Sequence, residues 1–150
     1  MIEIFTDGAS KGNPGPGGYG VILRSGAHNK ELSGGFRKTT NNRMELMGVI
    51  TGLEAIKDTG QEINIYSDSK YVIDPIEKNW LIGWQKKEFK DKKNPDLWKR
   101  LIPLLKKHKV TFHWVRGHAG HVENERCDEL AVAACTNSIL QIDHAYESNI

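Results

Sequence analysis

The chain has 150 residues, of which 38% are hydrophobic and 27% charged, a composition typical of one folded globular domain rather than a disordered or fibrous protein. A domain of this length buries roughly 68–70% of the surface that its unfolded chain exposes, so it folds without a metal or disulfide staple and any bound metal is functional. The net charge of +2 excludes no partner by itself, but no apolar run approaches the roughly 20 residues of a membrane span and no signal peptide opens the chain. We therefore expect a single domain over residues 1–150, located in the cytoplasm and without a membrane partner.

Apolar periodicity predicts an α/β fold that opens with three antiparallel strands, at residues 2–7, 18–24 and 30–37. The glycine-rich stretch at residues 12–20 contains a formal G-x-G-x-x-G, but a strand follows it where a dinucleotide-binding fingerprint requires a helix. A tight turn is the better interpretation. The next elements predicted are a helix over residues 42–58, in which Asn42 and Glu45 could form a capping box, and a strand over residues 62–68.

The second half of the chain alternates in the same way and completes an α/β fold with a mixed sheet. Short helices reach Trp84, and the pattern then predicts a helix over residues 96–107, a strand over 110–116 and an amphipathic helix over 123–135. Cys127 and Cys135 are eight residues apart in this last helix, so their Cα atoms lie about 12 Å apart and the two cannot form a disulfide. The cysteine content fits a reducing compartment.

Positive charge is concentrated in residues 85–109, where ten Lys and Arg residues stand against three acidic residues, for a net charge of +7. Trp80 and Trp84 lie just before this segment and share one helical face. Aromatic side chains interleaved with lysines suit contact with the sugars and phosphates of nucleic acid, although a solvated helix face is the alternative. We expect the other two tryptophans, Trp98 and Trp114, in the core.

Four carboxylates occur where predicted strands and helices begin or end. Asp7 ends the first strand, Asp68 ends the fourth, Glu45 lies near the start of a helix and Asp128 lies on the last helix. At about 100° per residue, Glu45 falls at the edge of its helix's apolar arc, within reach of Asp7 and Asp68. Converging carboxylates repel one another unless divalent cations neutralise them, and Mg²⁺ prefers oxygen ligands. Paired Mg²⁺ ions can activate water and stabilise the leaving oxygen in phosphodiester hydrolysis.

Five segments, in this order and spacing, resemble type 1 ribonuclease H, the bacterial ribonuclease HI group. They are Ile4-Phe-Thr-Asp-Gly-Ala9, Gly12-Asn-Pro-Gly-Pro-Gly-Gly-Tyr-Gly20, Thr39-Thr-Asn-Asn-Arg-Met-Glu-Leu46, Tyr66-Ser-Asp-Ser69, and Trp114-Val-Arg-Gly-His-Ala-Gly-His121 with Glu123-Asn-Glu-Arg-Cys-Asp-Glu-Leu-Ala131. The resemblance covers nearly the whole chain. It implies a ribonuclease H-like fold, with a five-stranded mixed sheet of order 3-2-1-4-5 flanked by helices. It also implies a monomeric enzyme that hydrolyses the RNA strand of RNA/DNA hybrids and leaves 5′-phosphate and 3′-hydroxyl ends.

The same resemblance implies a role for each carboxylate. Asp7 would bridge two Mg²⁺ ions, for which Mn²⁺ could substitute, and Asp128 would complete the site that activates the water. Glu45 and Asp68 would hold the second ion at the leaving oxygen. His118, in a glycine-flanked loop, would serve in proton transfer or product release, with an exposed loop histidine as the alternative.

Substrate contacts are implied for the residues around the predicted cleft. Thr40 and Asn42 would hold a DNA phosphate, and Asn13 and Asn41 would enter the minor groove. RNA would be selected through its 2′-hydroxyl groups near the carboxylates. Contacts with DNA sugars and phosphates along the basic segment would come from Trp80, Trp84, Lys86, Lys87 and Lys90. His113 and His121 are expected to be structural.

Three departures from the family pattern concern the binding surface and leave the carboxylates intact. Lys70 stands where the family usually has a minor-groove Gln, and its longer cationic side chain could contact a phosphate instead. Phe89 replaces the usual Trp in a shortened basic protrusion, and Pro103 should kink or end the helix around it. A catalytically inactive hybrid-binding module remains the alternative function, and a nuclease domain of a reverse transcriptase remains an alternative source of the same chemistry.

Overall fold

A five-stranded sheet of order β3-β2-β1-β4-β5 forms the centre of the computed structural model, which describes residues 1–116 and 121–148. This order confirms the predicted topology. β1 pairs antiparallel with β2 and β2 with β3, whereas β1, β4 and β5 run parallel to one another. The strands are β1 Ile2–Ser10, β2 Gly15–Ser25, β3 His28–Thr39, β4 Glu62–Ser67 and β5 Lys109–Trp114.

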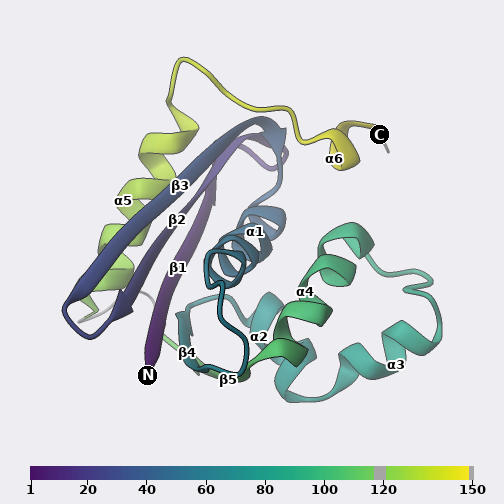
Figure 1. The fold of residues 1–150 in the computed structure, drawn as a ribbon. Coiled ribbons are helices and arrows are strands. Elements are labelled where there is room, and N and C mark those ends of the chain that lie inside the picture. The colour runs from purple at the N-terminus through teal and green to yellow at the C-terminus, as the bar shows by residue number, and fades with distance from the viewer. Residues whose placement is uncertain (117–120, 149–150) are drawn as a thin grey trace.

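Helices cover both faces of this sheet, as Figure 1 shows. α5 packs across β1, β2 and β3 on one face, and α1 packs across β1 and β2 on the other, with α4 beside it. Side chains alternate accordingly along β1: Ile4 lies in the core beneath α1, and Phe5 packs with Cys127 of α5. None of the described helices is long and apolar enough to cross a membrane. The helices are α1 Asn41–Glu54, α2 Lys70–Glu77, α3 Trp80–Lys86, α4 Pro95–Lys107, α5 Val122–Cys135 and α6 His144–Ser148.

The turn predicted between the first two strands is present but shorter than expected, because β2 begins before residue 18. β2 already begins at Gly15, and only residues 11–14 connect it to β1. The glycines instead allow α5 to approach β2 closely. A Cβ atom at Gly20 would lie 2.2 Å from the carbonyl oxygen of Cys127, and one at Gly18 would lie 2.6 Å from that of Ala131. Larger residues would push α5 away from the sheet.

The capping box predicted at Asn42 was also wrong. The N-cap of α1 is Thr40, whose extended backbone lets its hydroxyl accept a hydrogen bond from the backbone N–H of Arg43 at 3.2 Å. Asn42 therefore lies inside the first turn. Glu45 lies two positions beyond N3 and takes no part in capping, so its side chain is available to face the sheet.

Two predictions about the core hold and one does not. Trp98 is fully buried, and both cysteines are buried and free, as expected. Of the two effects predicted for Pro103, an end of the helix is wrong, because α4 continues to Lys107. Leu101 and Leu104 are buried on either side of this proline and anchor the helix to the core, which compensates for the missing N–H.

The last described residues return across the molecule to the start of α1, an arrangement that the sequence pattern did not predict (Figure 1). Gln141 forms a parallel bridge with Phe36 of β3, and the Arg37 guanidinium makes two hydrogen bonds of 2.9 Å with the carboxylate of Glu147 in α6. Residues 137–148 thereby form a C-terminal segment that lies along the outer edge of the sheet.

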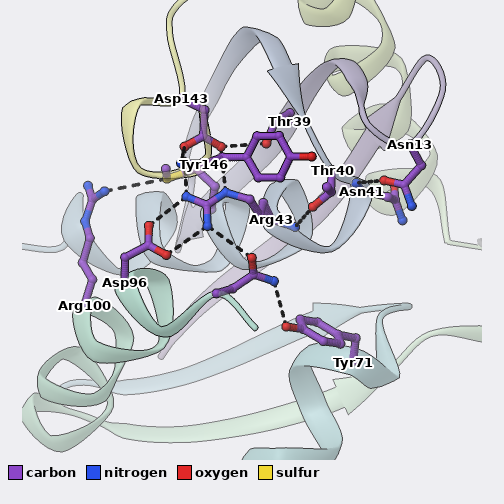
Figure 2. Close-up of polar contacts among 12 residues, drawn as sticks. Asn13, Thr39, Thr40, Asn41, Arg43, Tyr71, Asp96, Arg100, Asp143 and Tyr146 are labelled. Carbon is purple, nitrogen blue, oxygen red and sulfur yellow. Dashed lines mark hydrogen bonds and ion pairs between the residues drawn. The ribbon is translucent and has the colours of Figure 1, made fainter. Parts of the chain in front are cut away.

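Arg43 connects this C-terminal segment to the rest of the fold (Figure 2). Its side chain is only 4% exposed and forms paired hydrogen bonds with the carboxylates of Asp96 in α4, at 2.8 and 2.9 Å, and of Asp143, at 2.7 and 2.9 Å. Asp143 also accepts from the Thr39 hydroxyl at 2.7 Å. Burial raises the pKa of Asp96, but hydrogen bonding and the charge of Arg43 outweigh that effect and lower it overall. One buried cation thus fixes the first turn of α1 against two other parts of the chain.

Replacement of Arg43 by Met should destabilise the fold by roughly 3–5 kcal/mol, because Asp143 would be left buried without its counter-charge. The midpoint of urea-induced unfolding measures the loss. Arg37→Met is the matched control, since it removes an exposed Arg from an ion pair with the same C-terminal segment and should move the midpoint little. Equal, small shifts for both variants would contradict the central place of Arg43.

Candidate functional site

Three of the four predicted carboxylates meet at the end of the sheet where β1 and β4 finish. Asp7 of β1, Glu45 of α1 and Asp68 after β4 each offer a ligand oxygen, and these oxygens all lie within 4.8 Å of one another. The register explains why. Phe5 of β1 and Tyr66 of β4 are partners in a parallel ladder, and each carboxylate comes two residues later on its strand. Because the two strands run parallel, both aspartates lie at the same end of the sheet.

Glycine at position 8 is what lets Glu45 join the two aspartates. A Cβ atom there would lie 2.6 Å from the backbone nitrogen of Glu45 and 2.8 Å from its Oε1. Any larger residue would push the first turns of α1 away from β1. The backbone N–H of Gly8 also donates to Oδ1 of Asp7 at 2.9 Å, which orients that carboxylate.

Burial and mutual repulsion make this group electrostatically costly. Burial, followed by the charges of Asp7 and Asp68, raises the pKa of Glu45 well above its usual value. Asp7 and Glu45 are 3% and 5% exposed, and Oε1 of Glu45 is buried without a hydrogen-bond partner among the described residues. Because the folded state raises the pKa of Glu45, the free energy of unfolding falls as the pH rises above the ordinary pKa of a glutamate side chain. Close, partly desolvated carboxylate oxygens are the donor set of a hard divalent cation, so the residues fit a bound metal.

Of the other two predicted catalytic residues, only Asp128 is among the described residues, and it is not part of this group. Asp128 lies on α5, partly exposed, and its carboxylate is outside the group of three. It follows Asn124 by one helical turn, and Asn124 reaches the backbone of β1 just before Asp7, so Asp128 is on the helix face that borders the carboxylates. His118 lies outside the described residues. Both roles stay predictions.

The residues predicted to hold a DNA strand gather beside the N-terminus of α1. Asn13, Thr40 and Asn42 line an open pocket of about 590 Å³, whose opposite walls are Lys93 and Tyr146. Asn13 Oδ1 accepts a hydrogen bond from the backbone N–H of Asn41 at 3.1 Å, which ties the turn after β1 to the helix (Figure 2). Sequence reasoning missed that the C-terminal segment supplies one wall of this pocket.

The aromatic and basic residues form a second exposed surface. Trp80 and Trp84 of α3 have ring centroids 6.5 Å apart, with the ammonium of Lys78 5.2 Å from the first ring and that of Lys92 4.7 Å from the second. A pocket of about 630 Å³ beside this pair is lined by Trp84, Lys87, Lys90 and Lys92, and Lys86 is exposed at the end of α3.

Trp114 does not lie in the core, so that prediction was wrong. It is 46% exposed at the end of β5, and its indole N–H donates to the backbone carbonyl of Asp68 at 3.1 Å. The Lys70 ammonium lies 4.2 Å from the centroid of the Trp114 ring. His113 contacts Asn64 at 2.7 Å and stacks on Tyr66, which agrees with a structural role.

Sequence reasoning also gave no role to Asn124, which is 1% exposed. Its side-chain amide donates to the carbonyl oxygens of Thr6, at 3.4 Å, and Tyr66, at 3.1 Å. A signal was present in the sequence. Asn124 shares a helical face with Cys127 and Ala131, which are both fully buried. It is therefore a polar residue on a helix face whose other side chains are small and apolar.

Comparison with known proteins agrees with this geometry. The RNase H family model matches residues 1–136. A ribonuclease H of Desulforamulus reducens is 54% identical over 147 residues, which covers 95% of this chain and 92% of that protein. The crystal structure of LC9-RNase H1, a type 1 RNase H with the type 2 active-site motif, is 32% identical with a TM-score of 0.78 and covers 98% of this chain and 79% of that one. LC11-RNase H1, solved in complex with an RNA/DNA hybrid, shares the fold at 24% identity and a TM-score of 0.64 over 97% of this chain and 99% of its own. Family model, relatives, sheet order and carboxylate cluster agree that the chain belongs to the ribonuclease H family of enzymes.

Proposed function

We propose that this enzyme hydrolyses the RNA strand of RNA/DNA hybrids with two Mg²⁺ ions and leaves 5′-phosphate and 3′-hydroxyl ends. One observation carries the proposal: ligand oxygens of Asp7, Glu45 and Asp68 lie within 4.8 Å of one another where β1 and β4 end. The chain also belongs to the ribonuclease H family. The hybrid-bound neighbour LC11-RNase H1 supports the choice of substrate.

Each carboxylate has a distinct part in this mechanism. Asp7, the most buried of the three, would help to hold both ions, Glu45 and Asp68 would hold the ion at the leaving oxygen, and Asp128 would help to hold the ion that activates the water. When bound, the ions supply a water nucleophile at neutral pH and neutralise charge on the leaving oxygen. His118 assists proton transfer or product release and holds no metal. Mn²⁺ can replace Mg²⁺ because it accepts the same oxygen ligands.

The substrate lies across two surfaces of the chain. One DNA phosphate occupies the pocket at the start of α1, which Thr40 and Asn42 line and where the positive end of the helix dipole favours an anion. Asn13 and Asn41 enter the minor groove, and Lys70 contacts a phosphate beside the carboxylates. The DNA strand then continues over Trp80 and Trp84 toward Lys86, Lys87 and Lys90. RNA is selected where its 2′-hydroxyls pass the carboxylates.

An inactive hybrid-binding module is a weaker interpretation of the same surface. Binding alone gains nothing from three clustered carboxylates beside a phosphate backbone, since their charge repels the ligand. Burial of Asp7 and Glu45 adds a cost in stability that only a metal-dependent function explains.

Cleavage of labelled substrates tests the proposal directly. With Mg²⁺, the wild-type chain should cut the RNA strand of a hybrid and leave duplex RNA and duplex DNA intact, and the products should carry 5′-phosphates because water attacks. Asp7→Asn should lower turnover by more than about 100-fold, the upper range for residues that merely orient metal ligands. Cyclic phosphate products, or retained turnover in the variant, would contradict the mechanism.

A second prediction concerns the basic surface. Combined replacement of Lys86, Lys87 and Lys90 by Ala should raise the KM for hybrid several-fold and leave kcat nearly unchanged. Each lost phosphate contact should flatten the slope of log affinity against log salt concentration by about 0.7–0.9.

The control for this variant removes the same charge elsewhere. Lys30, Lys57 and Lys109, the last residue of the basic segment, are exposed at the end of the sheet opposite the carboxylates, and their replacement by Ala should leave the KM and the salt slope of the wild type. If both triple variants behave alike, the basic segment is only a solubilising surface.

A further inference from the structure

The chain that carries Asp68 is held by donors from two parts of the fold, α5 and the end of β5. Each of the three successive backbone carbonyls of residues 66–68 accepts a hydrogen bond. The first bond comes from the side-chain amide of Asn124 at 3.1 Å, the second from the backbone N–H of Val115 at 2.9 Å and the third from the indole N–H of Trp114 at 3.1 Å. Two of the three donors are side chains, from α5 and β5.

Asn124 also joins β4 to β1 where the ladder between the two strands ends. Phe5 and Tyr66 are the last paired residues, and from there the Asn124 amide spans the carbonyls of Thr6 and Tyr66. Thr6 immediately precedes Asp7. Both neighbours are acceptors, so the amide must present its NH₂ group to them. Its Oδ1 atom is buried without a hydrogen-bond partner among the described residues, so the chain retains a costly polar group to keep these two bonds.

Trp114 is too exposed for its main contribution to be core packing. It is 46% exposed, yet its N–H is satisfied by the Asp68 carbonyl and its ring lies against the Lys70 ammonium. The indole therefore fixes the backbone at Asp68 and holds the Lys70 ammonium against its ring.

We infer that Asn124 and Trp114 are positioning residues, which hold the backbone at Asp7 and Asp68 so that the carboxylate oxygens keep the spacing that divalent cations need. The carboxylates repel one another and would move the strand ends apart, and these hydrogen bonds resist that separation. Neither side chain is among the proposed metal ligands, so each acts through the aspartates. The inference rests on the proposed metal-dependent function.

Two variants remove the donors separately. Trp114→Phe keeps an aromatic ring beside Lys70 and loses the N–H, and its exposed position makes a folding defect small. Asn124→Ala removes the buried amide. For each, the concentration of MgCl₂ that gives half of the Mg²⁺-induced rise in Tm should increase by roughly 10- to 100-fold, the range for partners that orient metal ligands. The Mg²⁺ requirement for turnover should rise in parallel, excess Mg²⁺ should restore kcat, and the KM for hybrid should change by less than about twofold.

Leu101→Ala, in α4, is the control for lost stability, because Leu101 is fully buried in the core and is neither one of the carboxylates nor one of their backbone donors. It should lower Tm and leave the MgCl₂ requirement unchanged. If Asn124→Ala and Trp114→Phe behave as this control does, the two residues serve stability alone and the inference is overturned. A wild-type chain that binds Mg²⁺ and cuts no hybrid would overturn the proposed function. In that case the MgCl₂ concentrations needed to stabilise the variants would still decide whether Asn124 and Trp114 are positioning residues.

Discussion

Repulsion among three carboxylates within 4.8 Å is the constraint around which this end of the fold is built. Parallel pairing of β1 and β4 brings two of them together, and the missing side chain of Gly8 admits the third from α1. Burial makes the arrangement more costly, because the charges lose water that would screen them. The surrounding backbone must therefore be held firmly, and Asn124 and Trp114 donate hydrogen bonds just where the two strands end.

The first two turns of α1 carry an acidic and a basic side chain that contact different parts of the fold. Glu45 faces the carboxylate cluster, and Arg43, two residues earlier, faces Asp96 and Asp143. The same stretch of helix is thus fixed to the sheet on one side and to α4 and the C-terminal segment on the other (Figure 2). Thr40 caps this helix and lines the pocket assigned to a DNA phosphate, so the arrangement couples the substrate surface to the metal ligands through one rigid element.

Sequence reasoning reached those features that depend on local periodicity or on motif spacing. The convergence of Asp7, Glu45 and Asp68 was predicted from strand ends and helical phase, whereas the strand order was predicted only through the resemblance to ribonuclease H. It failed where contacts distant in sequence decide. The exposure of Trp114 depends on a hydrogen bond across 46 residues, and the glycines of β2 are needed for α5, which comes about 110 residues later. The C-terminal segment has little periodicity of its own and is fixed by Arg37 and Arg43.

The most direct test of the account is thermal unfolding of the wild type and of Glu45→Gln, each in EDTA and in Mg²⁺. Since the amide removes one of three repelling charges and keeps the shape of the side chain, the account predicts a higher Tm for the variant in EDTA, by about 2–4 °C for each kcal/mol of repulsion relieved. Mg²⁺ should raise the Tm of the wild type and have little effect on the variant. A variant that unfolds at a lower temperature than the wild type in EDTA, and still gains the full Mg²⁺-induced rise, would contradict the claim that these carboxylates are assembled to bind metal.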